Sequence, residues 1–256
     1  MSGTKKIINL FWTGGWDSTF RLIHLVLIYK KVVQPYYIID SGRNSVLQEI
    51  RAMVKIKNAL FEKDIKIKSR ILPTIFKEIK EINENKTIAQ SYTDLHVEES
   101  IAIQYEWLAR YCHEEGISNM ELCNETAIYD ADNQTRRLLD KDLDRIATNY
   151  GTHYKLNARA REKNIYKIYG NFHFPVFDYT KLDMYKISKK HGFDDVLKHT
   201  WFCLMPTSQL KPCGKCKPCR VVYREGLKWR LPITSKIRYF IWPTLRKIAH
   251  LLYIKR

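Results

Sequence analysis

The chain has 256 residues, of which 45% are apolar and 12% aromatic, with ten Gly and eight Pro. This composition excludes a disordered, collagen-like or low-complexity chain, because enough apolar side chains are present for a packed core. The longest nearly unbroken apolar run, Leu22–Tyr29, is far shorter than the ~20 residues of a membrane-spanning helix, and no secretory signal is recognisable at the start. We therefore expect a cytoplasmic protein with one large domain, or with one domain and an appendage.

The formal net charge is +17, from 44 Lys and Arg against 27 Asp and Glu. It is unevenly distributed, since residues 220–256 contain ten basic residues and one acidic residue, a net charge of +9. A basic surface attracts nucleic acid, nucleotides, anionic lipid or acidic proteins. Composition alone does not choose among these partners.

The first forty residues predict a strand–helix–strand unit. Lys6–Phe11 has the pattern of a buried strand, Phe20–Tyr29 has the periodicity of a helix, and Val32–Asp40 contains a second strand. Such a unit places its two strands parallel in one sheet. We therefore expect a Rossmann-like α/β fold, with a five-stranded parallel sheet and helices on both faces.

The turn between the first strand and the first helix is glycine-rich and reads Thr-Gly-Gly-Trp-Asp-Ser-Thr over residues 13–19. A Gly-Gly turn at a helix start presents free backbone N–H groups and the positive end of the helix dipole to an anion. The Gly-x-x-x-x-Gly-Lys-Ser/Thr phosphate loop and the Gly-x-Gly-x-x-Gly dinucleotide loop are both absent. The alternative is an ordinary βα turn that uses glycine for close packing.

Further along the chain we expect two more strands, a half-exposed one at Ile65–Leu72 and a short one at Met120–Cys123. We expect helices at Phe76–Asn85, Glu98–Glu115 and Leu182–His191, and a polar helical surface at Thr135–Asn157. Asn124 and Glu125 follow the short strand. Residues just past the carboxyl ends of parallel strands face the ligand crevice, so both are candidate substrate contacts. Cys112 and Cys123 are expected to be buried as small hydrophobic side chains.

Four of the six cysteines lie within 17 residues, at Cys203, Cys213, Cys216 and Cys219. In a reducing compartment such clustering favours a metal over disulfides. Four thiolates converging on one tetrahedral ion leave no open position, which is typical of a structural zinc site. A redox Cys-x-x-Cys pair and free thiols remain the alternatives.

The run Thr13–Ser18 resembles the Ser-Gly-Gly-x-Asp-Ser pyrophosphate loop of the ATP-pyrophosphatase superfamily, with Thr13 keeping the hydroxyl of the first serine. Thr200-Trp-Phe-Cys203, followed by Cys213-Gly-Lys-Cys216-Lys-Pro-Cys219, resembles the ending of the QueC family, the 7-cyano-7-deazaguanine synthases. Phe174–Lys181 and Asp40–Arg43 also look like QueC segments. The resemblance extends over about residues 6–225.

This resemblance implies an ATP-dependent ligase. QueC enzymes use ATP and magnesium to activate the carboxylate of 7-carboxy-7-deazaguanine, ammonia then forms an amide, and a second activation yields the nitrile. The implied pyrophosphate and magnesium site comprises Thr13, Gly14, Gly15, Trp16, Asp17, Ser18 and Thr19. Backbone near Leu10, Phe11, Ile39 and Asp40 is expected to hold adenine and ribose.

The same resemblance makes Asp17, Ser18 and Lys181 the candidate catalytic residues. The candidate substrate residues are Arg43, Asn124, Glu125 and Asp130. Two of these assignments have an alternative, because Asp17 is also suited to cap its helix and Lys181 to be a solvated lysine at a helix start.

The match fails in the middle of the chain. The Val-Pro-Gly-Arg-Asn motif of QueC is missing, and Asp94–Ser100 stands in the corresponding stretch. ATP activation is therefore better supported than nitrile synthesis. Relatives in bacterial anti-phage systems join the activated acid to a protein amine, and a divergent, basic chain fits that variant as well. The rival hypotheses are a tRNA-thiolating enzyme using Cys112 or Cys123, and a non-catalytic module that binds a nucleotide or a partner.

We expect three parts: a nucleotide-binding domain at residues 1–182, a helical zinc-binding portion at 183–225, and a basic tail at 226–256. In the tail, Tyr239–Ile254 is amphipathic, and Pro243 is expected to start or kink a helix. The tail is expected to pack on the body, to dock an acidic protein or nucleic acid, or to lie on an anionic membrane surface. The sequence is also compatible with a homodimer, since nothing in it determines the oligomeric state.

Overall fold

The computed structural model describes residues 6–126 and 134–254, and side chains as far as residue 243. Its central sheet has five strands in the order β3-β2-β1-β4-β7, and every neighbouring pair is parallel. The strands are β1 (Ile7–Phe11), β2 (Val32–Ile39), β3 (Ile75–Glu78), β4 (Met120–Glu121) and β7 (Phe172–His173). The predicted Rossmann-like sheet of five parallel strands is therefore confirmed.

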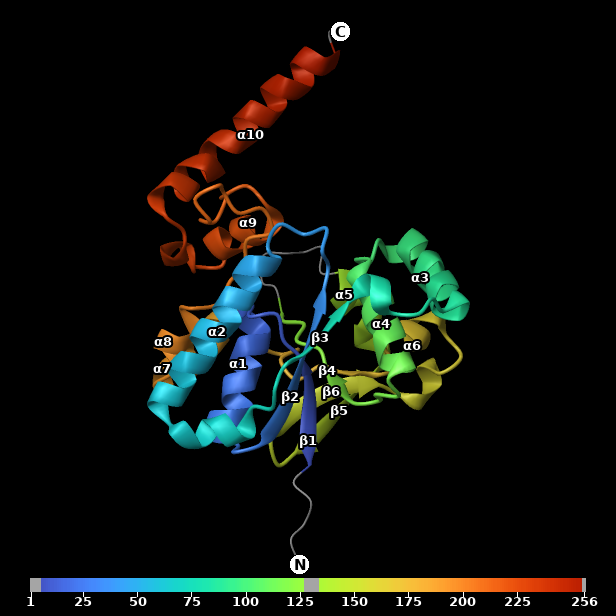
Figure 1. Ribbon diagram of the computed structural model, residues 1–256. Coiled ribbons are helices and arrows are strands. Elements are labelled where there is room, and N and C mark those ends of the chain that lie inside the picture. Colours follow the sequence, from blue (N-terminus) through green and yellow to red (C-terminus); the bar gives the residue numbers. More distant parts are fainter. Residues whose placement is uncertain (1–5, 127–133, 255–256) are drawn as a thin grey trace, which may run out of the picture.

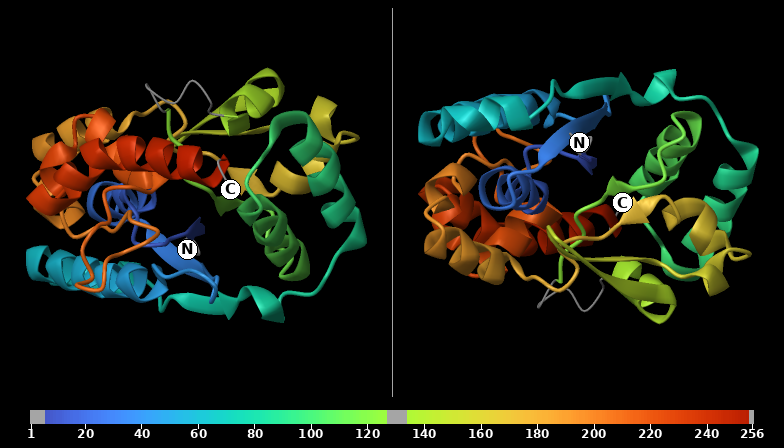
Figure 2. Two further views of the ribbon diagram at one scale, coloured as in Figure 1. Left: turned by 90° about the horizontal axis from the view of Figure 1, so that it is seen from above. Right: turned by 90° about the horizontal axis from the view of Figure 1, so that it is seen from below.

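Helices cover both faces of this sheet (Figures 1 and 2). One face carries α1 (Trp16–Ile23), α2 (Val46–Lys63), α7 (Lys181–Lys190) and α8 (Asp194–Leu197), and the other carries α3 (Lys86–Glu99), α4 (Gln104–Glu114), α5 (Gln134–Leu139) and α6 (Asn164–Tyr169). Because side chains alternate along a strand, Leu10 packs in the core under α1 and α2 whereas Phe11 packs in the core under α4 and α6.

Two predicted elements at the sheet edge were wrong. Ile65–Arg70 is a 3₁₀ helix rather than a strand, and the edge strand β3 occupies part of the predicted helix Phe76–Asn85. The edge strand leaves Ile75 and Phe76 half exposed and mixes acidic with basic residues. Its residues therefore lack the continuous apolar run that marks a buried parallel strand.

Two further elements differ from the prediction. The single helix Glu98–Glu115 is interrupted, because Ser100 adopts a left-handed conformation that ends α3 before α4 begins. The predicted helical surface at Thr135–Asn157 is mostly an antiparallel hairpin of β5 (Leu143–Thr148) and β6 (Gly151–Leu156). Gly151, with a φ of +103°, follows a turn that lets the chain reverse there.

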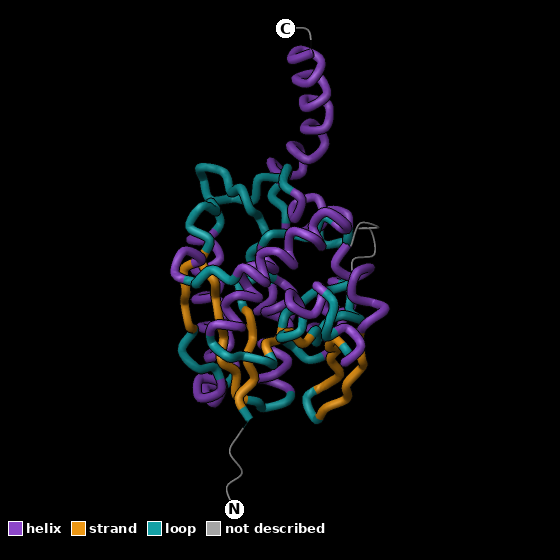
Figure 3. Tube along the Cα trace, turned by 90° about the vertical axis from the view of Figure 1, so that its right-hand side faces the viewer, coloured by secondary structure: helices purple, strands orange, loops and turns teal. Residues whose placement is uncertain are grey.

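The C-terminal segment lies above the carboxyl ends of the parallel strands (Figure 1). It contains α9 (Lys217–Arg224), a 3₁₀ turn (Lys228–Arg230) and α10 (Ile233–Ile254). The start of α10 packs on the cysteine-bearing loop, where the Ser235 hydroxyl donates to the Pro212 carbonyl over 2.5 Å. Pro243 lies inside α10, and the helix then runs away from the body (Figure 3). None of the helices in the described part of the chain combines the length and apolar content that crossing a bilayer requires.

A buried ion pair joins the first helix to the sheet. Arg21 of α1 donates to both carboxylate oxygens of Glu121 on β4, over 2.8 and 2.7 Å, and also to the Tyr150 carbonyl over 3.0 Å. Both charged side chains are only 3% exposed. The pair therefore anchors the helix that begins at the glycine-rich turn to the strand beside it.

We expect Glu121→Gln to lower the free energy of unfolding by about 3–5 kcal/mol, because it leaves the Arg21 charge buried without a countercharge. The double variant Arg21→Met/Glu121→Leu is expected to lose much less, since it removes both charges together. Urea denaturation of the three proteins measures the difference. If the free energy of unfolding of Glu121→Gln falls by less than about 1 kcal/mol, the pair contributes no more than a solvent-exposed salt bridge.

Candidate functional site

The glycine-rich turn leaves β1 and enters α1 at the carboxyl edge of the sheet. Gly14 has a φ of +69°, and a Cβ at this position would lie 2.9 Å from the carbonyl oxygen of Glu49. Only glycine fits both the conformation and the approach of α2. The Thr19 hydroxyl, fully buried, accepts a hydrogen bond from the Trp12 indole over 2.9 Å, so this side chain braces the turn from inside.

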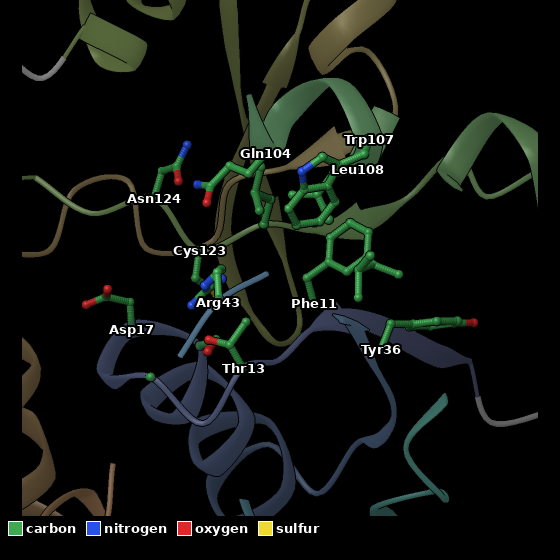
Figure 4. A pocket seen from close by; sticks show the side chains of 14 residues that line it. Phe11, Thr13, Asp17, Tyr36, Arg43, Gln104, Trp107, Leu108, Cys123 and Asn124 are labelled. Atoms are coloured by element: carbon green, nitrogen blue, oxygen red, sulfur yellow. The ribbon is translucent and has the colours of Figure 1, made fainter. Parts of the chain in front are cut away.

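Two cavities meet at this turn. The first has a volume of about 220 Å³ and the second about 420 Å³, and both are lined by Thr13, Gly15, Asp17, Arg43 and Gln104. Figure 4 shows the first cavity, which is lined by side chains from β1, β2 and α4 together with Asp17 and Thr13. Its apolar wall consists of Phe11, Tyr36, Ile38, Trp107, Leu108 and Leu122. An aromatic wall next to a glycine-rich turn at a helix N-terminus is an arrangement that can hold a planar base beside its phosphates.

Asp17 lies at the junction of the two cavities. Its Oδ1 atom is buried and has no hydrogen-bond partner among the described residues. Burial raises the pKa of the carboxyl group, against the opposing effects of Lys181, of its own backbone N–H and of Arg230. A buried carboxylate oxygen with an unused acceptor position fits a magnesium ion, which prefers oxygen ligands.

Lys181 is the first residue of α7, whose N-terminus is capped by Thr180 in a reciprocal pair with Asp183. Its ammonium group pairs with Glu125 and lies 3.2 Å from a carboxylate oxygen of Glu225. The side chain is 10% exposed, so it is not a solvated lysine. Glu225, far along the sequence in the segment after α9, was not singled out by sequence reasoning.

Arg43 lines both cavities and is held from behind by Glu49 of α2. The Glu49 carboxylate also accepts from the Ser45 hydroxyl over 2.6 Å and from the Tyr37 hydroxyl over 2.7 Å. This buried network orients the guanidinium toward the cavities. Asp40 instead accepts from the Gly42 N–H over 3.1 Å and stabilises the local turn.

The remaining predicted residues are distributed unevenly around the site. Ser18 and Asn124 line the first cavity, and Trp16 and Glu125 line the second. Leu10 is fully buried in the core, and Ile39 is partly buried against it. Asp130 lies outside the described residues. Gln104 and Trp107 of α4 were missed, because the sequence shows only a helix periodicity there and not which side chains reach the sheet edge.

The four cysteines converge as predicted. Their sulfur atoms all lie within 4.8 Å of one another, and the Cys213–Cys219 and Cys203–Cys216 sulfurs are 3.8 and 3.9 Å apart. A tetrahedral ion with sulfur ligands at ~2.3 Å requires sulfur–sulfur separations of about 3.8 Å. The backbone N–H groups of Cys213, Lys215 and Cys216 donate to cysteine sulfurs over 3.1–3.3 Å, which stabilises thiolates. The donor set and spacing fit zinc.

This cysteine cluster is connected directly to the glycine-rich turn. The Trp201 N–H donates to the Gly14 carbonyl over 2.9 Å, and the Trp201 indole donates to the Cys203 carbonyl over 2.7 Å. Trp201 and its neighbour Phe202 also line the second cavity. The cysteine-bearing loop therefore supplies one wall of that cavity, and we expect the conformation of this loop to determine the shape of the cavity.

Comparison with known proteins gives matches over part of the chain. Residues 152–228 match the family described as queuosine biosynthesis protein QueC. A 7-cyano-7-deazaguanine synthase from Prochlorococcus marinus strain MIT 9515 is 35% identical over 78 residues, which are 30% of this chain and 31% of that protein. The corresponding enzyme of P. marinus subsp. pastoris strain CCMP1986 is 34% identical over 75 residues, or 29% and 30% of the two chains. The chain thus matches less than a third of these relatives' length. The segment that matches the family contains Lys181 and the four cysteines and excludes the turn at residues 13–18.

Proposed function

We propose that this QueC-like chain activates the carboxylate of a 7-deazaguanine with ATP and releases pyrophosphate. The observation that carries the proposal is the position of Asp17. Its carboxylate lies on a glycine-rich, anion-binding turn, between an aromatic cavity suited to a nucleobase and a larger cavity with several cations. A carboxylate is a poor electrophile until it is converted to an acyl-adenylate, and both ligands need adjoining sites for that conversion.

Several residues that line the two cavities have roles that follow from their positions. Phe11 and Trp107 border the space for adenine, and the N–H groups at the start of α1 face the phosphates. Asp17 would hold magnesium, which neutralises phosphate charge when bound. Lys181 and Arg43 both line the second cavity, where pyrophosphate would depart from the α-phosphate as the acid's oxygen attacks it.

The fate of the activated acid forms the finer part of the proposal. Attack by ammonia gives an amide, and a second activation of that amide would give the nitrile. Attack by a protein amine gives a conjugate, as an anti-phage system would use. The larger cavity and the basic segment after residue 220 support an acidic protein as acceptor. We place the reaction in the cytoplasm, where cysteines remain reduced for zinc.

The test is to incubate the protein with ATP, magnesium and 7-carboxy-7-deazaguanine, with and without ammonium, and to detect AMP, amide and nitrile by mass spectrometry. We expect AMP to form only when 7-carboxy-7-deazaguanine is present. AMP and amide without nitrile would favour conjugation to an amine. If no AMP forms with any amine donor, although ATP binds, the chain is a non-catalytic nucleotide-binding module.

A tRNA-thiolating activity is the rival, and Cys123 is its best candidate because this residue lines the first cavity. Burial raises the pKa of the Cys123 thiol well above its ordinary value, with Glu121 adding to the effect. Since the thiolate is the nucleophile, we expect the thiol to be inert at neutral pH. Cys123→Ala should therefore keep AMP formation within about threefold of the unchanged protein, because the sulfur has no part in the proposed reaction. Transfer of sulfur to tRNA by the unchanged protein, lost in Cys123→Ala without a change in melting temperature, would favour the thiolation hypothesis.

A further inference from the structure

Arg230 is a partly buried cation of the second cavity that sequence reasoning did not identify. It ends the 3₁₀ turn Lys228–Arg230, just outside the segment that matches the family. Its Nη2 atom donates to the carbonyl oxygen and the hydroxyl of Thr200, over 2.7 and 2.6 Å. The guanidinium lies 4.8 Å from the centre of the Trp16 ring and 4.7 Å from that of Phe202. These contacts hold it in one orientation.

Part of this guanidinium is unused. The Nη1 atom is buried and has no hydrogen-bond partner among the described residues. Burial lowers the pKa of Arg230 to about 9, with Asp17 opposing the shift, and the group remains charged at neutral pH. A buried donor on a charged group costs stability unless a partner satisfies it, so the arrangement is complete only when an acceptor is bound.

Two other cations of this cavity have carboxylate partners. Lys181 is paired with Glu125 and Glu225, and Arg43 with Glu49. Their charges are largely balanced by the protein itself. Asp17 also lines this cavity and favours the charged form of Arg230, and the same carboxylate has an oxygen with no hydrogen-bond partner among the described residues. An unused cationic donor and an unused carboxylate oxygen therefore line one cavity, as expected for an anionic ligand that arrives with a metal ion.

We propose that Arg230 binds an oxyanion of the ligand in the second cavity through Nη1. Two sources share this chemistry: the pyrophosphate part of ATP, and the carboxylate of the acid to be activated. The identity of these two anions rests on the proposed function, whereas the existence of an oxyanion subsite rests on the geometry of Arg230. A planar guanidinium that is held by two aromatic rings and by Thr200 is well suited to such an anion, since its N–H donors form a fixed fork.

Calorimetric titration can test the subsite without relying on turnover. The full chain, loaded with zinc, is titrated with pyrophosphate in the presence of magnesium, and separately with 7-carboxy-7-deazaguanine. The variants are Arg230→Met, which removes the charge, and Arg230→Lys, which keeps the charge but loses the fork. Lys228→Met is the matched control, because Lys228 is exposed on the same 3₁₀ turn.

We expect Arg230→Met to weaken one of the two ligands at least about tenfold, the loss typical of a charge-assisted hydrogen bond. Arg230→Lys should restore part of that loss, and Lys228→Met should bind like the unchanged protein. A selective loss of pyrophosphate assigns the oxyanion to ATP, and a selective loss of the acid assigns it to the carboxylate.

The inference is overturned if both ligands bind Arg230→Met within twofold of the unchanged protein, or if the unchanged protein binds neither. Should Arg230→Met unfold, the comparison of Arg230→Lys with Lys228→Met decides, and equal binding by these two overturns it as well. Binding that depends on Arg230, in a protein that forms no AMP, supports the subsite and contradicts the proposed function, so the two failures are distinguishable.

Discussion

Asp17→Asn is expected to reduce acid-dependent AMP formation by roughly 10²–10³-fold, the loss seen when a preorganised charged or polar group is removed from a reacting centre. The same variant should not be less stable. Burial raises the pKa of Asp17, so at neutral pH the ionised carboxylate opposes folding. A neutral amide of the same shape relieves that cost, and we expect the melting temperature without ligands to rise or stay unchanged.

The measurement pairs initial AMP formation with thermal unfolding, both in the presence and absence of magnesium and ATP. Asp144→Asn is the control, because Asp144 is exposed on β5 outside both cavities. Full turnover by Asp17→Asn would refute the assignment of the loop. A marked drop in its melting temperature would instead show that Asp17 mainly caps α1.

Loss of a metal ion held by the cysteine cluster should disable both the fold of the C-terminal segment and the proposed nucleotide site. Zinc binding contributes ~10–16 kcal/mol in small structural sites, and here the bound loop also supplies Trp201 and Phe202 to the second cavity. We expect one zinc per chain, and a fall in melting temperature of roughly ten degrees or more for Cys213→Ser. Pyrophosphate binding should be lost at temperatures where the rest of the chain stays folded.

Metal analysis by mass spectrometry, thermal unfolding and pyrophosphate titration form the test, before and after treatment with a chelator. Cys112→Ala is the matched control, since Cys112 is buried in the other core cluster, away from the four converging cysteines. It should keep one zinc per chain. Less than about half an equivalent of zinc in protein prepared with zinc present would contradict a tetrathiolate site.

In the central sheet, local sequence patterns predict some elements correctly and fail for others. β1, the glycine-rich turn and α1 follow one another within about twenty residues, and each has a local signature of apolar residues or glycine. β3 and β5 are partly exposed strands that mix charged with apolar residues, so their residues resemble a solvated helix until the neighbouring strand is known. Strand pairing is a long-range contact that periodicity does not encode.

The candidate site divides in the same way. The sequence by itself determined the glycine-rich turn and the four-cysteine cluster, because their residues lie a few positions apart and backbone geometry brings them together. Only the tertiary structure decided that the two features are adjacent, through the Trp201–Gly14 hydrogen bond. It alone also placed Glu225 beside Lys181 and Arg230 in the cavity of Asp17. Such pairs are separated by tens to hundreds of residues, and their approach depends on how helices pack on the sheet and not on any local spacing.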